Sequence, residues 1–218
     1  QLKGHYHELS HETKDSIRRE LESLWSPYRE GRIQVDLQVV DRGKDHLLLS
    51  ERMEDIFGQE VLAQKYTHRF TALGAEEYVQ KRYCNIFTAM KAFWTHPDIR
   101  AFLCLNQVLP MPGKRAMDEN LLRDAWKDLQ KRYAPQAVGE MTVLRSGEQF
   151  EESKEHLLQE LQNGARRFVL SSYQTLGAGQ NLQYPIQELS NLVVLNAEYD
   201  EKDPRFQKKD FDALYLGD

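Results

Sequence analysis

The chain has 218 residues, of which 40% are hydrophobic and 29% are charged, and its formal net charge is −5. This length allows one large domain or two small ones with a sizeable core, and the composition is that of an ordinary globular protein. The acidic balance excludes the globally basic surface of a dedicated nucleic-acid-binding module, although a few well-placed cations are enough to contact phosphates locally.

Two further features of the composition concern the compartment. The sequence has no apolar run near 18 residues, so we expect no transmembrane helix and no membrane partner. The two cysteines, Cys84 and Cys104, lie in apolar surroundings, which favours reduced core thiols over a disulfide. The sequence therefore predicts a cytoplasmic protein.

The first 97 residues are mostly helical in pattern. Helical spacing of apolar residues predicts an amphipathic helix over residues 13–25, and strict alternation over residues 33–39 predicts a strand with one solvated face. Between residues 53 and 94, two apolar stripes predict two helices that are separated near Gly74. The first stripe contains Phe57, Val61, Leu62 and Tyr66, and the second contains Tyr78, Tyr83, Ile86, Phe87, Met90 and Phe93.

From residue 98 onward, short apolar runs alternate with amphipathic segments. The runs predict strands buried on both faces, and Ser146 with Gln149 is the pattern of a capping box before the second helix. The predicted order is strand 101–105, helix 117–133, strand 141–144, a helix ending at Asn163–Gly164, strand 167–170 and strand 191–195. Such alternation predicts an α/β fold, a parallel sheet flanked by helices and preceded by a mostly helical region. We place the boundary between residues 1–97 and 98–218, at His96–Pro97.

The segment over residues 169–182 carries the most chemical information. It reads Val-Leu-Ser-Ser-Tyr-Gln-Thr-Leu-Gly-Ala-Gly-Gln-Asn-Leu, a buried strand that runs into small, hydroxylated residues and two glycines. Functional loops of open parallel sheets follow the carboxyl ends of strands. Hydroxyl and amide groups there can bind phosphate, and glycine lets the backbone approach a ligand closely.

This segment resembles motif V of superfamily-2 helicases, especially the chromatin-remodeller-like branch, whose pattern is a strand, Ser or Thr, and then Gly-x-Gly-x-Asn-Leu. The Leu161-Gln-Asn-Gly164 run before the strand and the apolar run over residues 191–195 after it agree with the family's order. The strand over residues 101–105 would be the motif IV strand that opens the C-terminal RecA-like lobe. The resemblance covers roughly residues 98–200 and implies that the parent protein is an ATP-dependent DNA or RNA translocase.

The resemblance also implies roles for individual residues. Ser172, Thr175 and Gly177 would face nucleic acid, and Gly179, Gln180 and Asn181 would face the nucleotide. The implied cofactors of the parent are ATP and Mg²⁺. The implied partners are DNA or RNA and the N-terminal RecA-like lobe of the same polypeptide. Motif V would couple closure of the two lobes on ATP to a step along the strand.

Other parts of such an ATPase are missing from the sequence. There is no Gly-x-x-x-x-Gly-Lys-Ser/Thr loop, since Gly113-Lys114 is followed by Arg115, and no strand ends in an Asp-Glu pair. Residues 197–218 offer Arg205 but no Gly-Arg of motif VI. Phosphoryl transfer needs these parts. We therefore expect a piece of a longer ATPase that has no catalytic residue and no metal ligand of its own and does not hydrolyse ATP alone.

Two other interpretations stay open. Leu176-Gly-Ala-Gly179 could begin a Rossmann-like Gly-x-Gly-x-x-Gly loop, but Leu182 stands where the third glycine belongs. Alternatively, the chain could be a non-catalytic interaction domain on a RecA-like scaffold. The role of residues 1–97, the choice between DNA and RNA, and the oligomeric state are not indicated by the sequence.

Overall fold

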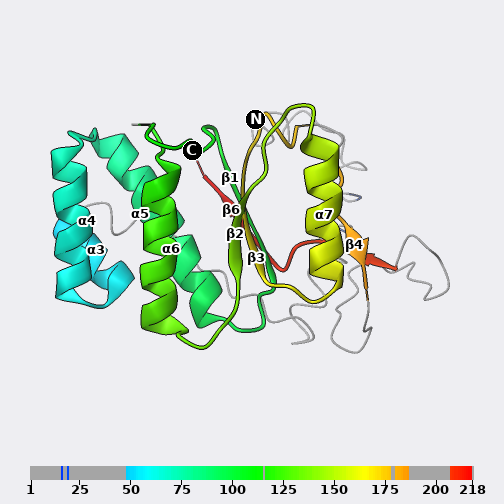
Figure 1. The fold of residues 1–218 in the computed structure, drawn as a ribbon, viewed down its shortest axis with the longest axis horizontal. Coiled ribbons are helices and arrows are strands. Elements are labelled where there is room, and N and C mark those ends of the chain that lie inside the picture. The colour runs from blue at the N-terminus through cyan, green and yellow to red at the C-terminus, as the bar shows by residue number, and fades with distance from the viewer. Residues whose placement is uncertain are drawn as a thin grey trace. The chain divides into compact units, whose positions relative to one another are not determined.

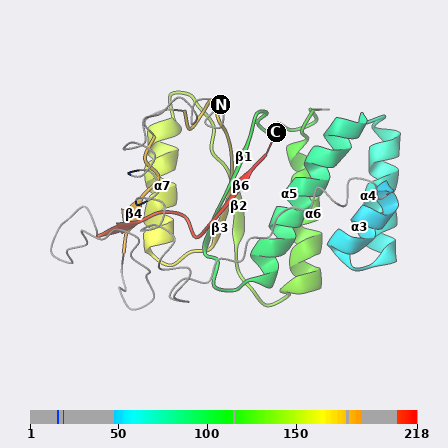
Figure 2. The same cartoon turned by 180° about the vertical axis from the view of Figure 1, so that it is seen from behind.

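The structure is a computed structural model, and it describes residues 48–114, 116–177, 180–186 and 207–217, together with Ser16 and Arg19. By internal contacts the chain divides into two units, residues 1–38 with 187–207 and residues 39–186 with 208–218. The fold below is that of the second unit (Figures 1 and 2). The predicted helix over 13–25 and the predicted strands over 33–39 and 191–195 lie outside this account.

The second unit is an α/β structure with a four-stranded parallel sheet, which confirms the predicted fold class. The strand order in the sheet is β2-β3-β1-β6, and β4 and β5 form a separate antiparallel pair. In chain order the elements are α3 (Leu49–Phe57), α4 (Glu60–Ala72), α5 (Glu77–Thr95), β1 (Ala101–Asn106), α6 (Glu119–Tyr133), β2 (Glu140–Val143), α7 (Phe150–Gln162), β3 (Arg167–Ser172), β4 (Tyr184–Pro185), β5 (Lys208–Lys209) and β6 (Ala213–Leu216).

The sheet is covered on both faces because its central strands are apolar on both sides. Phe102 and Phe168 pack with the helices α3 to α6, while Ala101 and Val169 pack with α7. Figure 1 shows α5 and α6 on one side of the sheet and α7 on the other, and Figure 2 shows the same layers from behind. Successive residues along each central strand thus pack alternately into the hydrophobic cores on the two faces of the sheet.

The helical region and the sheet share one hydrophobic core. Phe57 stacks on Tyr66 with ring centroids 4.4 Å apart, and Phe87 meets both rings edge-on. The same core continues through Trp126, whose ring lies 5.4 Å from that of Phe168 on β3. The core therefore contains residues from both sides of position 97, and the predicted domain boundary there stays a prediction.

The predicted apolar stripes of the helices were wrong at two residues, Val61 and Tyr78, which are exposed. Gly58 ends α3 in the left-handed conformation (φ 61°), and Gly74 (φ 54°) lies between α4 and α5 as predicted. The break at Gly58 rotates the next helix, so that Val61 is 78% exposed rather than part of the stripe. Tyr78, at the start of α5, is also exposed, and the guanidinium of Arg82 lies over its ring.

The predicted capping box before α7 is wrong as well. The helix begins at Phe150, its N-cap residue is Gln149, and no side chain caps it. A turn closed by the amide of Phe150 donating to the carbonyl of Gly147 occupies the place that the capping box would need. No helix within the described ranges is both long enough and apolar enough to cross a membrane.

Candidate functional site at the carboxyl edge of the sheet

The carboxyl ends of β1 and β3 lie side by side at the centre of the sheet. Their last residues, Asn106 and Ser172, are register partners. The connection after β1 leads to α6 on one face, whereas the connection after β3 brings Leu182 and Tyr184 into the core on the α7 face. Adjacent parallel strands whose connections leave to opposite faces define a topological switch point, where open α/β sheets bind ligands.

Ser172 and Thr175, which the sequence assigns to nucleic acid, are brought together within the loop itself. The Ser172 Oγ and Thr175 Oγ1 atoms are 2.9 Å apart, and the Thr175 amide donates to Ser172 Oγ at 3.1 Å. Both side chains are buried. Hydroxyls in such an arrangement form a local turn with the backbone. In this structure they shape the loop and tie it to β3.

Of the remaining assigned residues, Gly177 is half-buried, whereas Gln180 and Asn181 are exposed. Gly177 has no positive φ, and a Cβ there would meet its nearest atoms at 3.5 Å, so neither backbone nor space requires glycine. Gln180 is exposed, and its Oε1 accepts from Lys154 Nζ at 3.1 Å. Asn181 is exposed, and its Oδ1 accepts from the Gln183 amide at 3.0 Å. Gly179 lies outside the described residues.

Two residues that the sequence did not assign lie at the same edge. Asn106 is 1% exposed, and its Oδ1 atom accepts no hydrogen bond from the described part of the chain. Tyr173 is 39% exposed, and its hydroxyl donates to the Gly217 carbonyl at 2.8 Å. The signal for Asn106 was a polar residue at the end of an apolar strand. The contact of Tyr173 with Gly217, 44 positions away, had no sequence signal.

Gly217 fits closely against this edge. Its amide donates to the Leu105 carbonyl at 2.7 Å. A Cβ at this position would overlap with the side-chain oxygen of Asn106 and approach the ring of Tyr215 at 2.9 Å. The segment that ends β6 therefore lies against the buried amide at the end of β1, and glycine is needed there for steric reasons.

The thiol nearest this edge is not a nucleophile. Cys104 is fully buried on β1, and burial raises the pKa of its thiol to about 12, although the amide of Asn106 donates to its Sγ and acts in the opposite direction. Burial likewise raises the pKa of Cys84 to about 11. Both cysteines are free and buried, as predicted. Neutral thiols in such surroundings are inert core residues.

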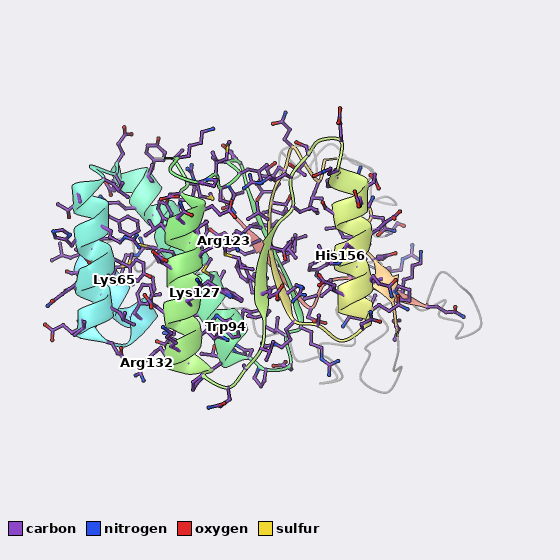
Figure 3. All side chains as sticks on the ribbon, viewed as in Figure 1. Lys65, Trp94, Arg123, Lys127, Arg132 and His156 are labelled. Carbon is purple, nitrogen blue, oxygen red and sulfur yellow. The ribbon has the colours of Figure 1, made fainter. Side chains whose placement is uncertain are left out.

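Several basic side chains that could line a phosphate groove instead make structural contacts. Figure 3 shows Lys65 on α4 and Arg123, Lys127 and Arg132 along α6. Lys65 pairs with Asp128 at 2.6 Å, Arg123 pairs with Glu119 at 2.6 Å, and Arg132 donates to the Gly58 carbonyl. The contacts of Lys65 and Arg132 tie α6 to α4 and to the end of α3, whereas the Arg123–Glu119 pair lies within α6.

The Arg166–Arg167 pair is structural too. Arg166 donates to the carbonyls of Phe93, His96 and Ile99 beyond the end of α5. Arg167 is 8% exposed and pairs with Glu160 at 2.6 Å. Hydrogen bonds from Arg167 hold the pKa of the Glu160 carboxyl below its ordinary value. Neither arginine therefore presents a free guanidinium for phosphate.

The donor set at this edge suits a sugar or a base better than a metal-bound triphosphate. Its exposed groups are the amides of Gln174, Gln180 and Asn181 and the phenol of Tyr173. The nearby ammonium of Lys154 is held by Glu151 at 2.5 Å. Within the described ranges, no three His, Cys, Asp or Glu residues come together as a metal site. Mg²⁺ prefers carboxylate and phosphate oxygens, so these groups do not fit it.

No protein-family model matches the chain, and no curated protein shows significant sequence similarity to it. The chemistry of the site is therefore argued from its own geometry.

Proposed function

We propose that this chain is part of the C-terminal lobe of an ATP-dependent DNA or RNA helicase or translocase of superfamily 2. The loop after β3 would lie at the nucleic-acid and nucleotide cleft. The observation that carries the proposal is a coincidence of sequence and topology. The segment that resembles motif V, residues 169–182, begins on a central strand and continues into the loop at the switch point between β1 and β3. This is where open parallel sheets bind their ligands.

The contacts within this loop separate residues that position it from residues that are exposed on it. The hydroxyls of Ser172 and Thr175 hold the loop on β3, so their contribution to binding is to position it. The side chains of Gln180 and Asn181 are exposed, and a nucleotide ribose or base would replace their contacts with Lys154 and Gln183. When two lobes close, a loop fixed in this way would move together with the sheet. A displacement of the lobe would then be transmitted directly to the bound nucleic-acid strand.

ATP and Mg²⁺ enter this proposal as cofactors of the parent protein. Since the donor set of this edge does not fit a metal-bound triphosphate, we derive no catalytic step from it. The phosphate loop, the metal carboxylate and the arginine finger would come from elsewhere in the parent, including the N-terminal RecA-like lobe. We expect no ATP hydrolysis by the chain alone.

The Rossmann-like alternative gains no support from the loop's continuation. A dinucleotide-binding glycine loop opens a helix whose N-terminus holds the pyrophosphate. After Gly177, the described residues 180–186 contain the short strand β4 and no helix. A non-catalytic interaction domain is the second candidate, and the engagement of Lys65, Arg123 and Arg166 in internal contacts favours it.

Hydrogen exchange of the 218-residue chain, with and without excess single-stranded DNA, duplex DNA or RNA, tests the proposal. We expect weak, salt-sensitive binding that protects amides of residues 173–183 and leaves α3 and α4 unchanged. Asn181→Ala should weaken nucleotide binding, whereas Gln136→Ala at the opposite edge of the sheet should not. ATP turnover should equal the buffer blank.

Two results would count against the proposal. Turnover above the blank that Asn181→Ala abolishes would contradict the expected lack of catalysis. Absence of saturable binding to any nucleic acid would leave the interaction domain as the better explanation.

A further inference from the structure

Tyr173 is held at both ends at the switch point. Its amide donates to the Asn106 carbonyl at 3.2 Å, across the gap between β3 and β1. Its hydroxyl donates to the Gly217 carbonyl at 2.8 Å, and Gly217 is in turn bound to Leu105. The side chain is nevertheless 39% exposed. A large aromatic ring is thus fixed in place and presented to solvent at the edge where a ligand is expected.

We infer that the Tyr173 ring is a stacking platform for a base of the bound DNA or RNA strand. This inference rests on the proposed function and adds to it a contact with a base rather than with the sugar-phosphate backbone. A ring whose rotamer is already fixed loses little conformational freedom on binding, so most of the stacking energy contributes to affinity.

The neighbours of Tyr173 favour a base over a cationic or metal-bound ligand. The exposed side chains of Gln174, Gln180 and Asn181 on the same loop carry both donors and acceptors, which suit the edge of a base. Every base has a flat π face, so stacking tolerates sequence. The contact would therefore hold a strand without reading it, as a translocating protein requires.

The inference assigns different roles to the ring and to the hydroxyl of Tyr173. The ring would bind the base, while the hydroxyl only orients the ring through Gly217. Tyr173→Phe keeps the ring and removes the hydroxyl, and Tyr173→Ala removes both. Gln136, which is exposed before β2 at the opposite edge of the sheet, offers the control, since Gln136→Ala removes a side chain that lies outside this loop.

The test is fluorescence anisotropy of the full 218-residue chain with labelled oligothymidylate and with an abasic strand, each of about 12 nucleotides. Tyr173→Ala should weaken binding of oligothymidylate by about 5- to 150-fold and leave the abasic strand unaffected, because only the first carries bases. Tyr173→Phe and Gln136→Ala should stay within about 3-fold of the wild type, a change well below that expected of a lost base stack. Melting curves establish that each variant is folded.

Each other outcome has a definite meaning. If the wild type binds oligothymidylate and Tyr173→Ala binds it equally well, the stacking inference is overturned and the proposed function stands. If Tyr173→Ala weakens both strands to the same extent, the residue acts through the fold and the inference is also overturned. If the wild type binds neither strand, both proposals fall.

Discussion

Replacing Ser172 by alanine removes the group that holds the loop after β3 to its strand. The Oγ atom accepts from the Thr175 amide at 3.1 Å and shares a hydrogen bond with Thr175 Oγ1 at 2.9 Å, both in buried surroundings. An unsatisfied buried amide costs about 1–3 kcal/mol, and a lost hydroxyl pair about 1 kcal/mol. Ser172→Ala should therefore lower the free energy of unfolding by about 2–4 kcal/mol.

A double-mutant cycle makes this argument quantitative. Thr175→Val keeps the shape of the side chain and the hydrogen bond from the backbone amide of residue 175 to Ser172 Oγ, but it removes the hydroxyl. It should therefore cost about 1 kcal/mol. The double variant should be less destabilised than the sum of the two single variants by about 1 kcal/mol, because the hydroxyl pair is counted in both.

Urea denaturation measures these differences. For a slope near 2 kcal/mol/M, Ser172→Ala should lower the midpoint by roughly 1–2 M. Ser146→Ala, in the exposed loop after β2, is the control and should change stability by less than about 0.5 kcal/mol. A stable Ser172→Ala variant, or additivity of the cycle to within about 0.3 kcal/mol, would refute the reasoning and return both hydroxyls to a direct role in binding.

Three further predictions concern the rest of the fold. Gly139→Ala should destabilise the protein by about 1–3 kcal/mol in urea denaturation, because a Cβ there lies 3.0 Å from an indole carbon, whereas Gly177→Ala should change stability by less than about 0.5 kcal/mol. The stabilisation from the lowered pKa of Glu160 beside Arg167 is fully present above the unfolded-state value of about 4.3 and is lost as pH falls through the folded-state value. The urea midpoint of Glu160→Gln should therefore fall less between about pH 5 and pH 3 than that of the wild type; equal slopes would contradict the pairing. Cys104 should resist alkylation at about pH 8 in the native protein and react after unfolding, as followed by mass spectrometry; rapid native labelling would contradict its burial.

The sequence predicted the α/β class because the central strands are buried on both faces. Short apolar runs such as the one over 101–105 have few alternatives between helical segments, and the structure has β1 at this place. The helix before Tyr133 was also predicted closely, since Asp118 caps it by accepting from the Asn120 amide. Local chemistry is sufficient where the pattern and the cap agree.

The errors arose where local pattern and chain geometry diverged. The apolar count ran through Gly58, whose left-handed conformation ends α3, and Val61 was assigned to the wrong face. The strand β6 was missed because it is short and two of its leucines, Leu214 and Leu216, are exposed. Its place beside β1 is secured by Asp212, whose carboxylate accepts from two amides at the start of that strand, a contact over more than a hundred positions.

Of the candidate site, the sequence predicted the loop but not its internal order. It identified the small and hydroxylated residues after β3, yet gave no means of knowing that Ser172 and Thr175 bond to each other rather than face outward. Asn106 stood out only as a polar residue at the end of an apolar strand, and its burial could not be predicted because it depends on Gly217 lying against it. Such contacts arise only when distant strands pair.

The hydrophobic core that α3 to α6 share with the sheet has a consequence for how the protein unfolds. Phe93 of α5 touches Trp126 of α6, with ring centroids 5.2 Å apart, and both lie against Phe168 of β3. Removing residues 1–97 would strip one member from this aromatic trio and leave the other two facing water. The shortened chain should aggregate during expression. In the full chain, the slow-exchanging amides of α5 and β3 should open in one global event rather than in two separate steps.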